Sequence, residues 1–192
     1  MLIACLVAGY ERDAWLLARE KLHDSLVRFS KRDWPIELSF ADSPSALVAA
    51  KPDVAAISLL RELEEAKPLD EVARRLREDA TSLADFGATV FLCSIFRACP
   101  NPESLERIRR LNLLAAEISR ETGAQVIDID REFAHFGARP LETDYRLRSL
   151  KATDLAARVI VDALLEAAFD DDVPVEILQQ AQQHVRTNAA FR

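Results

Sequence analysis

The sequence predicts an α/β protein in which helices cover both faces of a five-stranded parallel sheet, giving three layers. Short apolar runs rich in Val, Ile and Leu alternate along the chain with longer segments of helical periodicity. The runs are apolar at nearly every position, which is typical of strands buried on both faces. With 192 residues, 49% of them apolar, the chain can bury one sizeable core.

Five apolar runs, each followed by a turn or a helix signal, are predicted as the strands. They are residues 2–9, 35–41, 53–60, 88–95 and 124–130. The first reads LIACLVAG and the fifth reads AQVIDID. Because helical segments separate them, the strands are expected to run parallel.

Helices are predicted from capping residues and from apolar residues at helical spacing. Asp13 is the expected N-cap of the first helix, whose stripe contains Trp15, Leu16, Leu22 and Leu26. The next helices are expected at residues 43–51, 67–87, 101–123 and 150–165. The stretch between the fifth strand and the last of these helices is expected to be a loop.

The chain is predicted to divide into an α/β domain at residues 1–170 and a C-terminal helical extension at residues 171–192. Within the extension, a helix at 175–190 carries only a narrow apolar stripe that includes Ile177, Leu178 and Val185. A stripe of this kind packs either on a protein partner or second subunit, or on its own domain. The first alternative makes these residues candidates for partner binding.

Charge and composition argue against several classes of function and indicate a cellular location. The formal net charge of −7 argues against a nucleic-acid binder and against docking on anionic membranes. The first residues do not form a signal peptide, and no run approaches the roughly 18 apolar residues that span a bilayer. Together with three cysteines that cannot all pair, this predicts a cytoplasmic protein.

No cofactor and no metal are predicted. The chain has only four glycines and no glycine-rich phosphate-binding motif. Asp128, Asp130 and Glu132 alternate at the end of the fifth predicted strand, but no His or Cys stands at ligand spacing beside them.

The order of strands and helices resembles the SGNH, or GDSL-type, hydrolases. The resemblance is best from Gly87 to Leu165, where the strand ATVFLCSI is followed by a proline-containing loop and the helix RRLNLLAAEISRETG. The strand AQVIDID, a loop with Asp144 and the helix LKATDLAARVIVDALL complete it. The resemblance implies a flavodoxin-like fold, hydrolysis of esters, and a role for Asp144 in orienting a catalytic His.

The signature residues of that family are mostly missing. Tyr10 or Glu11 stands where the resemblance requires the nucleophilic Ser, and Leu147 stands where it requires the His. The third strand lacks the Gly and Asn of the oxyanion hole, so Asp144 alone matches. Losing the nucleophile, the base and the oxyanion donors together predicts a catalytically degenerate protein that acts as a binding or accessory subunit.

Charged and polar residues cluster where the strands are predicted to end, which is where ligands bind in open parallel sheets. The cleft candidates are Tyr10, Glu11, Arg12, Arg61, Glu62, Ser94, Arg97 and Arg146. The arginines predict either a site for a small anionic ligand or an internal salt-bridge network that fills the site.

Two further functions remain open at this point. One is an active esterase, acyl hydrolase or acyltransferase with a rebuilt site, in which Ser94, Cys99 or His135 acts beside Asp144. The other is a nucleotide-binding or receiver-like doubly wound domain, against which the missing phosphate loop argues.

Overall fold

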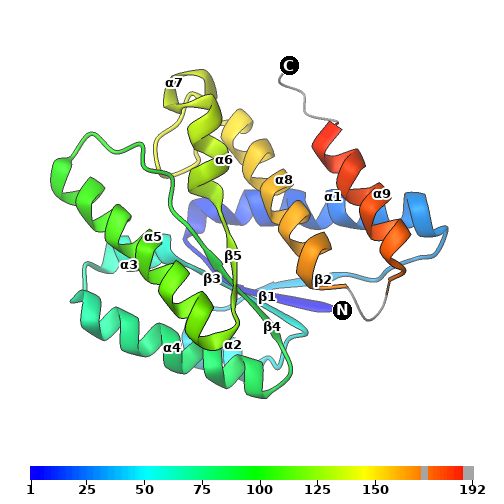
Figure 1. Ribbon diagram of the computed structural model, residues 1–192, viewed down its shortest axis with the longest axis horizontal. Coiled ribbons are helices and arrows are strands. Elements are labelled where there is room, and N and C mark those ends of the chain that lie inside the picture. The colour runs from blue at the N-terminus through cyan, green and yellow to red at the C-terminus, as the bar shows by residue number, and fades with distance from the viewer. Residues whose placement is uncertain (170–172, 188–192) are drawn as a thin grey trace.

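A computed structural model describes residues 1–169 and 173–187 of the chain. Five parallel strands form one sheet in the order β2-β1-β3-β4-β5 (Figure 1). The strands are β1 (Leu2–Leu6), β2 (Glu37–Phe40), β3 (Val54–Ser58), β4 (Thr89–Cys93) and β5 (Gln125–Ile127). The register pairs Ile3 with Val54 and Ala55 with Val90, so β1, β3 and β4 form the centre of the sheet.

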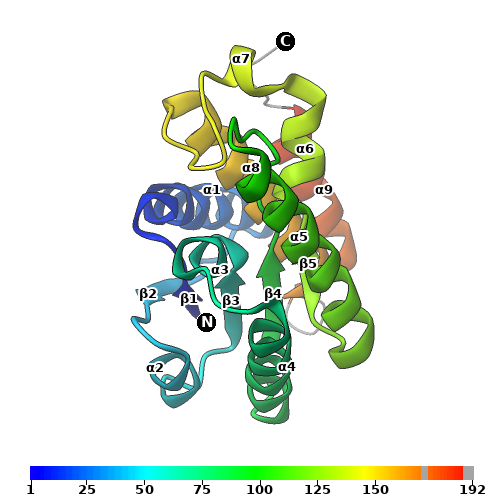
Figure 2. The same cartoon turned by 90° about the vertical axis from the view of Figure 1, so that its left-hand side faces the viewer.

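Helices cover both faces of the sheet, as the sequence predicts (Figure 2). One face carries α1 (Arg12–Ser30), α6 (Ile129–Phe136), α8 (Leu150–Ala167) and α9 (Val175–Thr187). The other carries α2 (Pro44–Ala49), α3 (Leu59–Glu65), α4 (Leu69–Asp85) and α5 (Pro102–Thr122). Two short elements complete the described fold, the 3₁₀ turn η1 (Gly9–Glu11) and α7 (Ala138–Leu141).

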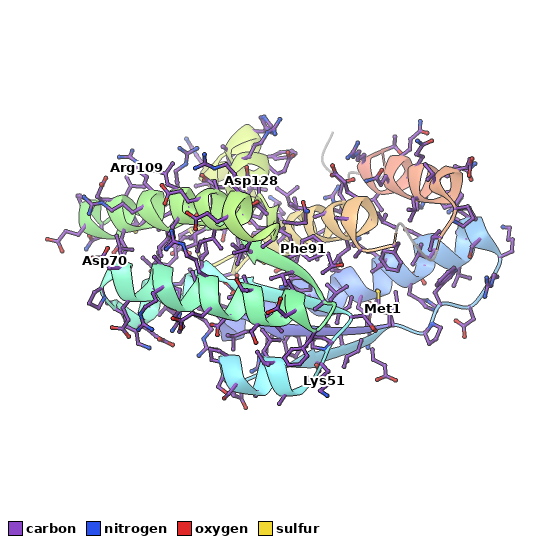
Figure 3. All side chains as sticks on the ribbon, turned by 60° about the horizontal axis from the view of Figure 1, so that its bottom comes forward. Met1, Lys51, Asp70, Phe91, Arg109 and Asp128 are labelled. Carbon is purple, nitrogen blue, oxygen red and sulfur yellow. The ribbon has the colours of Figure 1, made fainter. Side chains whose placement is uncertain are left out.

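Each face of the sheet contributes to its own hydrophobic core. Alternate residues of a strand point to opposite faces, so Phe91 packs with the α1 and α8 side whereas Leu92 packs with the α4 and α5 side. Figure 3 shows Phe91 inside the molecule, while Asp70 and Arg109 lie on the outer surfaces of α4 and α5. Both faces of the sheet are therefore buried, which explains why the strands are apolar throughout.

Each predicted strand is longer than the strand observed, and the third and fifth predictions extend into the following helix. The third ends at Ser58, whose hydroxyl caps α3 by accepting the N–H of Leu60 at 3.1 Å. The fifth ends at Ile127, after which Asp128 caps α6 by accepting the N–H of Arg131 at 3.1 Å. The stretch after β5 that was expected to be a loop therefore contains α6 and α7, because a capping side chain stops each strand and starts a helix.

The predicted stripe of the first helix is correct except at one position. Trp15, Leu22 and Leu26 are buried, but Leu16 is 41% exposed.

Helix α9 packs on its own domain. Leu178 and Val185 are buried against the core formed with α1 and α8, and Ile177 packs partly against it. His184 contacts the edge of the Phe29 ring, with 5.6 Å between ring centroids. A partner can reach this stripe only if α9 leaves the domain. Residues 170–172 and 188–192, which fall in the predicted extension, lie outside the described residues.

Candidate functional site

The candidate site lies beyond the carboxyl ends of the strands. The segment that leaves β1 turns Glu11 into the interior, where it is only 7% exposed. One of its carboxylate oxygens accepts the N–H of Ala8 at 2.7 Å, and the other accepts the hydroxyl of Ser58 at 2.8 Å. One of the two positions at which the family resemblance requires a nucleophile therefore holds a buried acid, tied to β1 and β3.

Burial controls the chemistry of the titratable groups at this point. It raises the pKa of Glu11 to about 7, although the hydrogen bonds from Ser58 and Ala8 act in the opposite direction. Burial also raises the pKa of Cys93, at the end of β4, well above its ordinary value. Cys93 is therefore a thiol at neutral pH and a poor nucleophile.

Leu147 lies against the same small cavity as Glu11. Its side chain is 5% exposed, and its backbone adopts a left-handed conformation with φ of 54°. The cavity has a volume of about 10 Å³, room for no more than one water molecule. Its lining is mostly apolar: Glu11, Ala14, Trp15, Cys93, Ile129, Leu147, Ala156 and Ile160. The structure thus brings together two positions that depart from the hydrolase pattern and leaves only a small space between them.

Asp144 makes its hydrogen bonds within its own loop. One carboxylate oxygen accepts the N–H of Arg146 at 2.8 Å, and the other pairs with the guanidinium of Arg146 at 2.9 Å. That guanidinium also lies over the ring of Tyr145, 4.6 Å from its centroid. Because Leu147 has no polar side-chain atom, the carboxylate has no base to orient at that position.

Ser94 and Arg97 belong to a network that joins the ends of β4 and β5. The hydroxyl of Ser94 donates to Asp128 at 3.1 Å and accepts the N–H of Asp130 at 3.0 Å. Asp130 accepts the N–H of Arg97 at 3.0 Å, pairs with its guanidinium at 2.6 Å, and accepts from the Asn112 amide at 3.3 Å. Ser94 is 6% exposed, and its hydroxyl connects the end of β4 to the start of α6.

Asn112 is a site residue that the sequence analysis missed. Its amide bonds both backbone groups of Ile95, donating to the carbonyl and accepting from the N–H, each at 2.8 Å. The available signal was a polar residue one helical turn after Ile108, on the stripe of α5 that is otherwise apolar. Ser58 was missed because it stands at the end of an apolar run that reads as one strand.

Replacing Asp130 by Ala is expected to lower the free energy of unfolding by about 1–2 kcal/mol, because it leaves the partly buried Arg97 N–H and Asn112 amide without their acceptor. Urea unfolding measures this loss. The exposed substitution Glu117→Ala, on α5, is the control and is expected to change stability by less than about 0.5 kcal/mol. Equal stability of the two variants would show that the network does not hold the loop.

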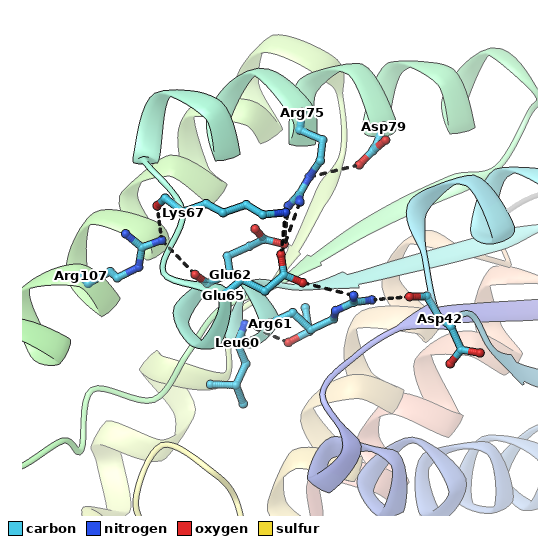
Figure 4. A network of polar contacts seen from close by, with 10 residues as sticks. Asp42, Leu60, Arg61, Glu62, Glu65, Lys67, Arg75, Asp79 and Arg107 are labelled. Carbon is cyan, nitrogen blue, oxygen red and sulfur yellow. Dashed lines mark hydrogen bonds and ion pairs between the residues drawn. The ribbon is translucent and has the colours of Figure 1, made fainter.

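Arg61 and Glu62 belong to a polar network around α3 and point to different sides of that helix (Figure 4). Glu62 is 3% exposed and forms an ion pair with Arg75 of α4. Arg61 donates to the carbonyl of Asp42 and pairs with Glu65, both at 3.4 Å. The two residues lie on α3 instead of in a loop after β3. This placement directs Glu62 toward α4, and Arg61 toward the segment that follows β2.

Arg107 of α5 completes this network. Its guanidinium donates to the carbonyl of Glu62 at 2.9 Å and to the carbonyl of Lys67 at 2.6 Å, so it caps the end of α3. Charges of both signs therefore pair here, as the salt-bridge alternative of the sequence analysis predicts for Arg61 and Glu62. The pairing is incomplete, because one buried atom each of Glu62, Arg75, Asp79 and Arg107 has no hydrogen-bond partner among the residues that the structure describes.

Tyr10 and Arg12 lie at the rim of the site. The hydroxyl of Tyr10 donates to Glu64 at 2.7 Å, and burial together with this hydrogen bond raises the pKa of the phenol. Arg12 lies over the ring of Phe40 at 5.1 Å and 3.6 Å from Asp42. Both side chains hold η1 and the start of α1 against neighbouring segments.

The residues of a rebuilt active site are dispersed. The side chain of His135 is 65% exposed on α6, where its nearest acid is Glu132 at 3.8 Å. Cys99 is partly buried, unpaired, and packs on the α3 and α5 side.

In the described part of the chain, no group of three or more His, Cys, Asp or Glu is arranged to hold a metal ion. No described helix is long and apolar enough to cross a bilayer.

Comparisons with known proteins identify the fold. No protein-family model matches the sequence, and no curated protein matches it. Among solved structures, an acetyl xylan esterase aligns over 86% of this chain and 98% of its own, with a TM-score of 0.62 and 12% identity. A catalytic mutant of an acetylxylan esterase from Geobacillus stearothermophilus aligns over 85% and 92%, with a TM-score of 0.61 and 14% identity.

A structure assigned to the SGNH hydrolases, from Slackia heliotrinireducens, aligns over 85% of this chain and 98% of its own, with a TM-score of 0.56 and 15% identity. At these identities the likeness concerns the fold, and it agrees with the sheet order and with the helices on both faces. The chain therefore has the fold of the SGNH, or GDSL-type, hydrolases.

Proposed function

We propose that this chain is a catalytically degenerate SGNH-hydrolase-like protein that acts by binding, as an accessory protein. The observation that carries the proposal is the small size, about 10 Å³, of the cavity between Glu11 and Leu147. Ester hydrolysis at this position needs a nucleophile, a base and room for a tetrahedral intermediate. Both carboxylate oxygens of Glu11 already accept hydrogen bonds, Leu147 offers no base, and the space holds no more than one water.

The surface around the small cavity supports binding. Tyr10 and Tyr145 are partly exposed, and the Arg97 side chain is 51% exposed. Aromatic rings and guanidinium groups contribute strongly to recognition surfaces. Arg97 and Arg146 already pair with Asp130 and Asp144, so a small anionic ligand would have to compete with those carboxylates. A protein partner, which contacts a wider surface, fits this arrangement better.

The same proposal includes a cytoplasmic location. All three cysteines are unpaired, and two of them are buried, which is the arrangement expected of a protein in a reducing compartment.

The alternative is an active esterase or acyltransferase with a rebuilt site around Asp144, and the esterase activity of the structural relatives favours it. Hydrolysis of p-nitrophenyl acetate separates the two proposals. We expect wild type, Asp144→Ala and Ser94→Ala to hydrolyse it no faster than buffer, and a serine-directed fluorophosphonate to label none of them. The exposed substitution Ser45→Ala is the control.

An active site would give a different result. Loss of the acid from a working triad lowers turnover on the order of 10⁴-fold. Turnover by wild type that disappears in Asp144→Ala but persists in Ser45→Ala would overturn the proposal of a degenerate site. A fluorophosphonate adduct, located by mass spectrometry, would then identify the nucleophile.

A further inference from the structure

Strand β5 leaves one side of the sheet open. It is the last strand, paired only with β4 (Figure 1). The N–H of Ser94 donates to the carbonyl of Ile127 at 3.0 Å, so the backbone groups of Ile127 face β4. In a parallel ladder alternate residues face alternate sides, and the N–H and C=O of Val126 therefore face away from β4. Within the described residues, these two groups have no hydrogen-bond partner.

A groove of about 520 Å³ opens beside this edge, between β5 and the helices α6, α8 and α9. Its apolar lining includes Phe136, which is 37% exposed, together with Leu155 and Val159. The volume lies in the range of pockets that hold small ligands or a few residues of a peptide. The unpaired edge of β5 and the exposed ring of Phe136 thus lie in the same groove.

The groove is lined by charges of both signs, including the acids Glu132 and Glu166, and some of these charges pair within the protein. Arg186 forms two hydrogen bonds with Asp162, each at 2.8 Å. Asp128 accepts from Ser94 and from the backbone of Arg131. The guanidinium of Arg131 is different, because it is exposed and has no partner among the described residues. It is therefore available for a carboxylate of an incoming molecule.

We propose that this edge binds an extended peptide segment of another protein, which adds a sixth strand beside Val126. A peptide supplies all the complementary groups at once: a main-chain N–H and C=O for Val126, an apolar side chain for the ring of Phe136, and an acidic side chain for Arg131. The proposal goes beyond the proposed function, since the groove is separate from the Glu11 cavity and would bind a peptide whether or not the chain hydrolyses esters.

The test begins with random peptides displayed on phage and selected on the full chain. Selected sequences are expected to combine apolar and acidic residues. Their synthetic forms are then titrated calorimetrically against wild type, Val126→Pro, Arg131→Glu and the control Arg139→Glu, an exposed arginine outside the groove. Proline removes only the N–H that faces the groove, so the ladder with β4 is kept. Each of the first two variants is expected to weaken binding about 10-fold or more, and the control to leave it unchanged.

Hydrogen exchange keeps the test decisive if Val126→Pro does not fold. In wild type, the bound peptide is expected to slow exchange of the Val126 amide, and Arg131→Glu is expected to weaken that peptide. Failure of any peptide to be enriched, or equal binding by wild type and Arg131→Glu with no slowing at Val126, would overturn the proposal. A dimer in light scattering that Val126→Pro abolishes would also overturn it, because a second copy would then occupy the edge.

Discussion

The Glu11→Gln variant is expected to keep about 3 kcal/mol of unfolding free energy that wild type loses as the pH rises from 4.5 to about 7. The ordinary pKa of a Glu side chain is 4.5, and burial raises that of Glu11 to about 7. Between these values the unfolded chain releases the proton while the folded chain retains it. Stability contributed by the protonated acid is therefore complete below pH 4.5 and is lost as the pH rises toward 7.

The magnitude follows from the difference between the two pKa values, since one pKa unit corresponds to about 1.4 kcal/mol. Other carboxylates also titrate in this range, so the quantity to compare is the stability of Glu11→Gln minus that of wild type. Urea unfolding at a series of pH values should show this difference growing with pH. The same series for the exposed substitution Glu103→Gln should stay level. A level series for Glu11→Gln would mean that the carboxyl is ionised in the folded chain.

Truncation of Leu178 to Ala should lower the free energy of unfolding by about 2–4 kcal/mol. The side chain is 4% exposed and lies in the core that α9 shares with α1 and α8. Removing it leaves a cavity where the helix meets the domain, so that α9 should also become more accessible to proteolysis. Thermal or urea unfolding and limited trypsin digestion measure the two effects.

The matched control for this helix is Gln179→Ala, one residue along and exposed. It should change stability by less than about 0.5 kcal/mol. If Leu178→Ala left the isolated chain as stable as Gln179→Ala did, the apolar stripe of α9 would have to be covered by something other than its own domain. The prediction of partner binding through Ile177, Leu178 and Val185 would then gain direct support.

The strand and helix pattern of this fold was predictable because the three central strands, β1, β3 and β4, are buried on both faces. Runs such as LIACLVAG contain almost no polar residue, and no other arrangement buries so many of them in alternation with amphipathic helices. The ends of β3 and β5 were harder to place. Leu59, Leu60 and Ile129 extend the apolar runs, although each already lies in the first turn of a buried helix. Hydrophobicity alone does not distinguish these two states over so few residues.

The candidate site was predictable in position but not in geometry. Glu11 and Leu147 were identified as departures from the hydrolase pattern, and the structure places both against one cavity. The ion-pair partners of Arg61 and Glu62 could not be predicted, because the position of a long charged side chain depends on which partner its helix faces. Glu62 faces Arg75, which is distant in sequence. The sequence alone therefore indicated which chemistry is missing, but not where the charges pair.

The packing of α1 has a consequence for how the protein is made. This helix comprises residues 12–30, yet the helices that cover it, α8 and α9, lie between residues 150 and 187. Translation adds roughly 5–20 residues per second. The apolar face of α1 is therefore synthesised on the order of ten seconds before α8 and α9, which pack on it. During that interval Trp15, Leu22 and Leu26 are exposed on the nascent chain. Chaperone dependence of this protein should therefore be greatest during synthesis and should end when the last two helices emerge.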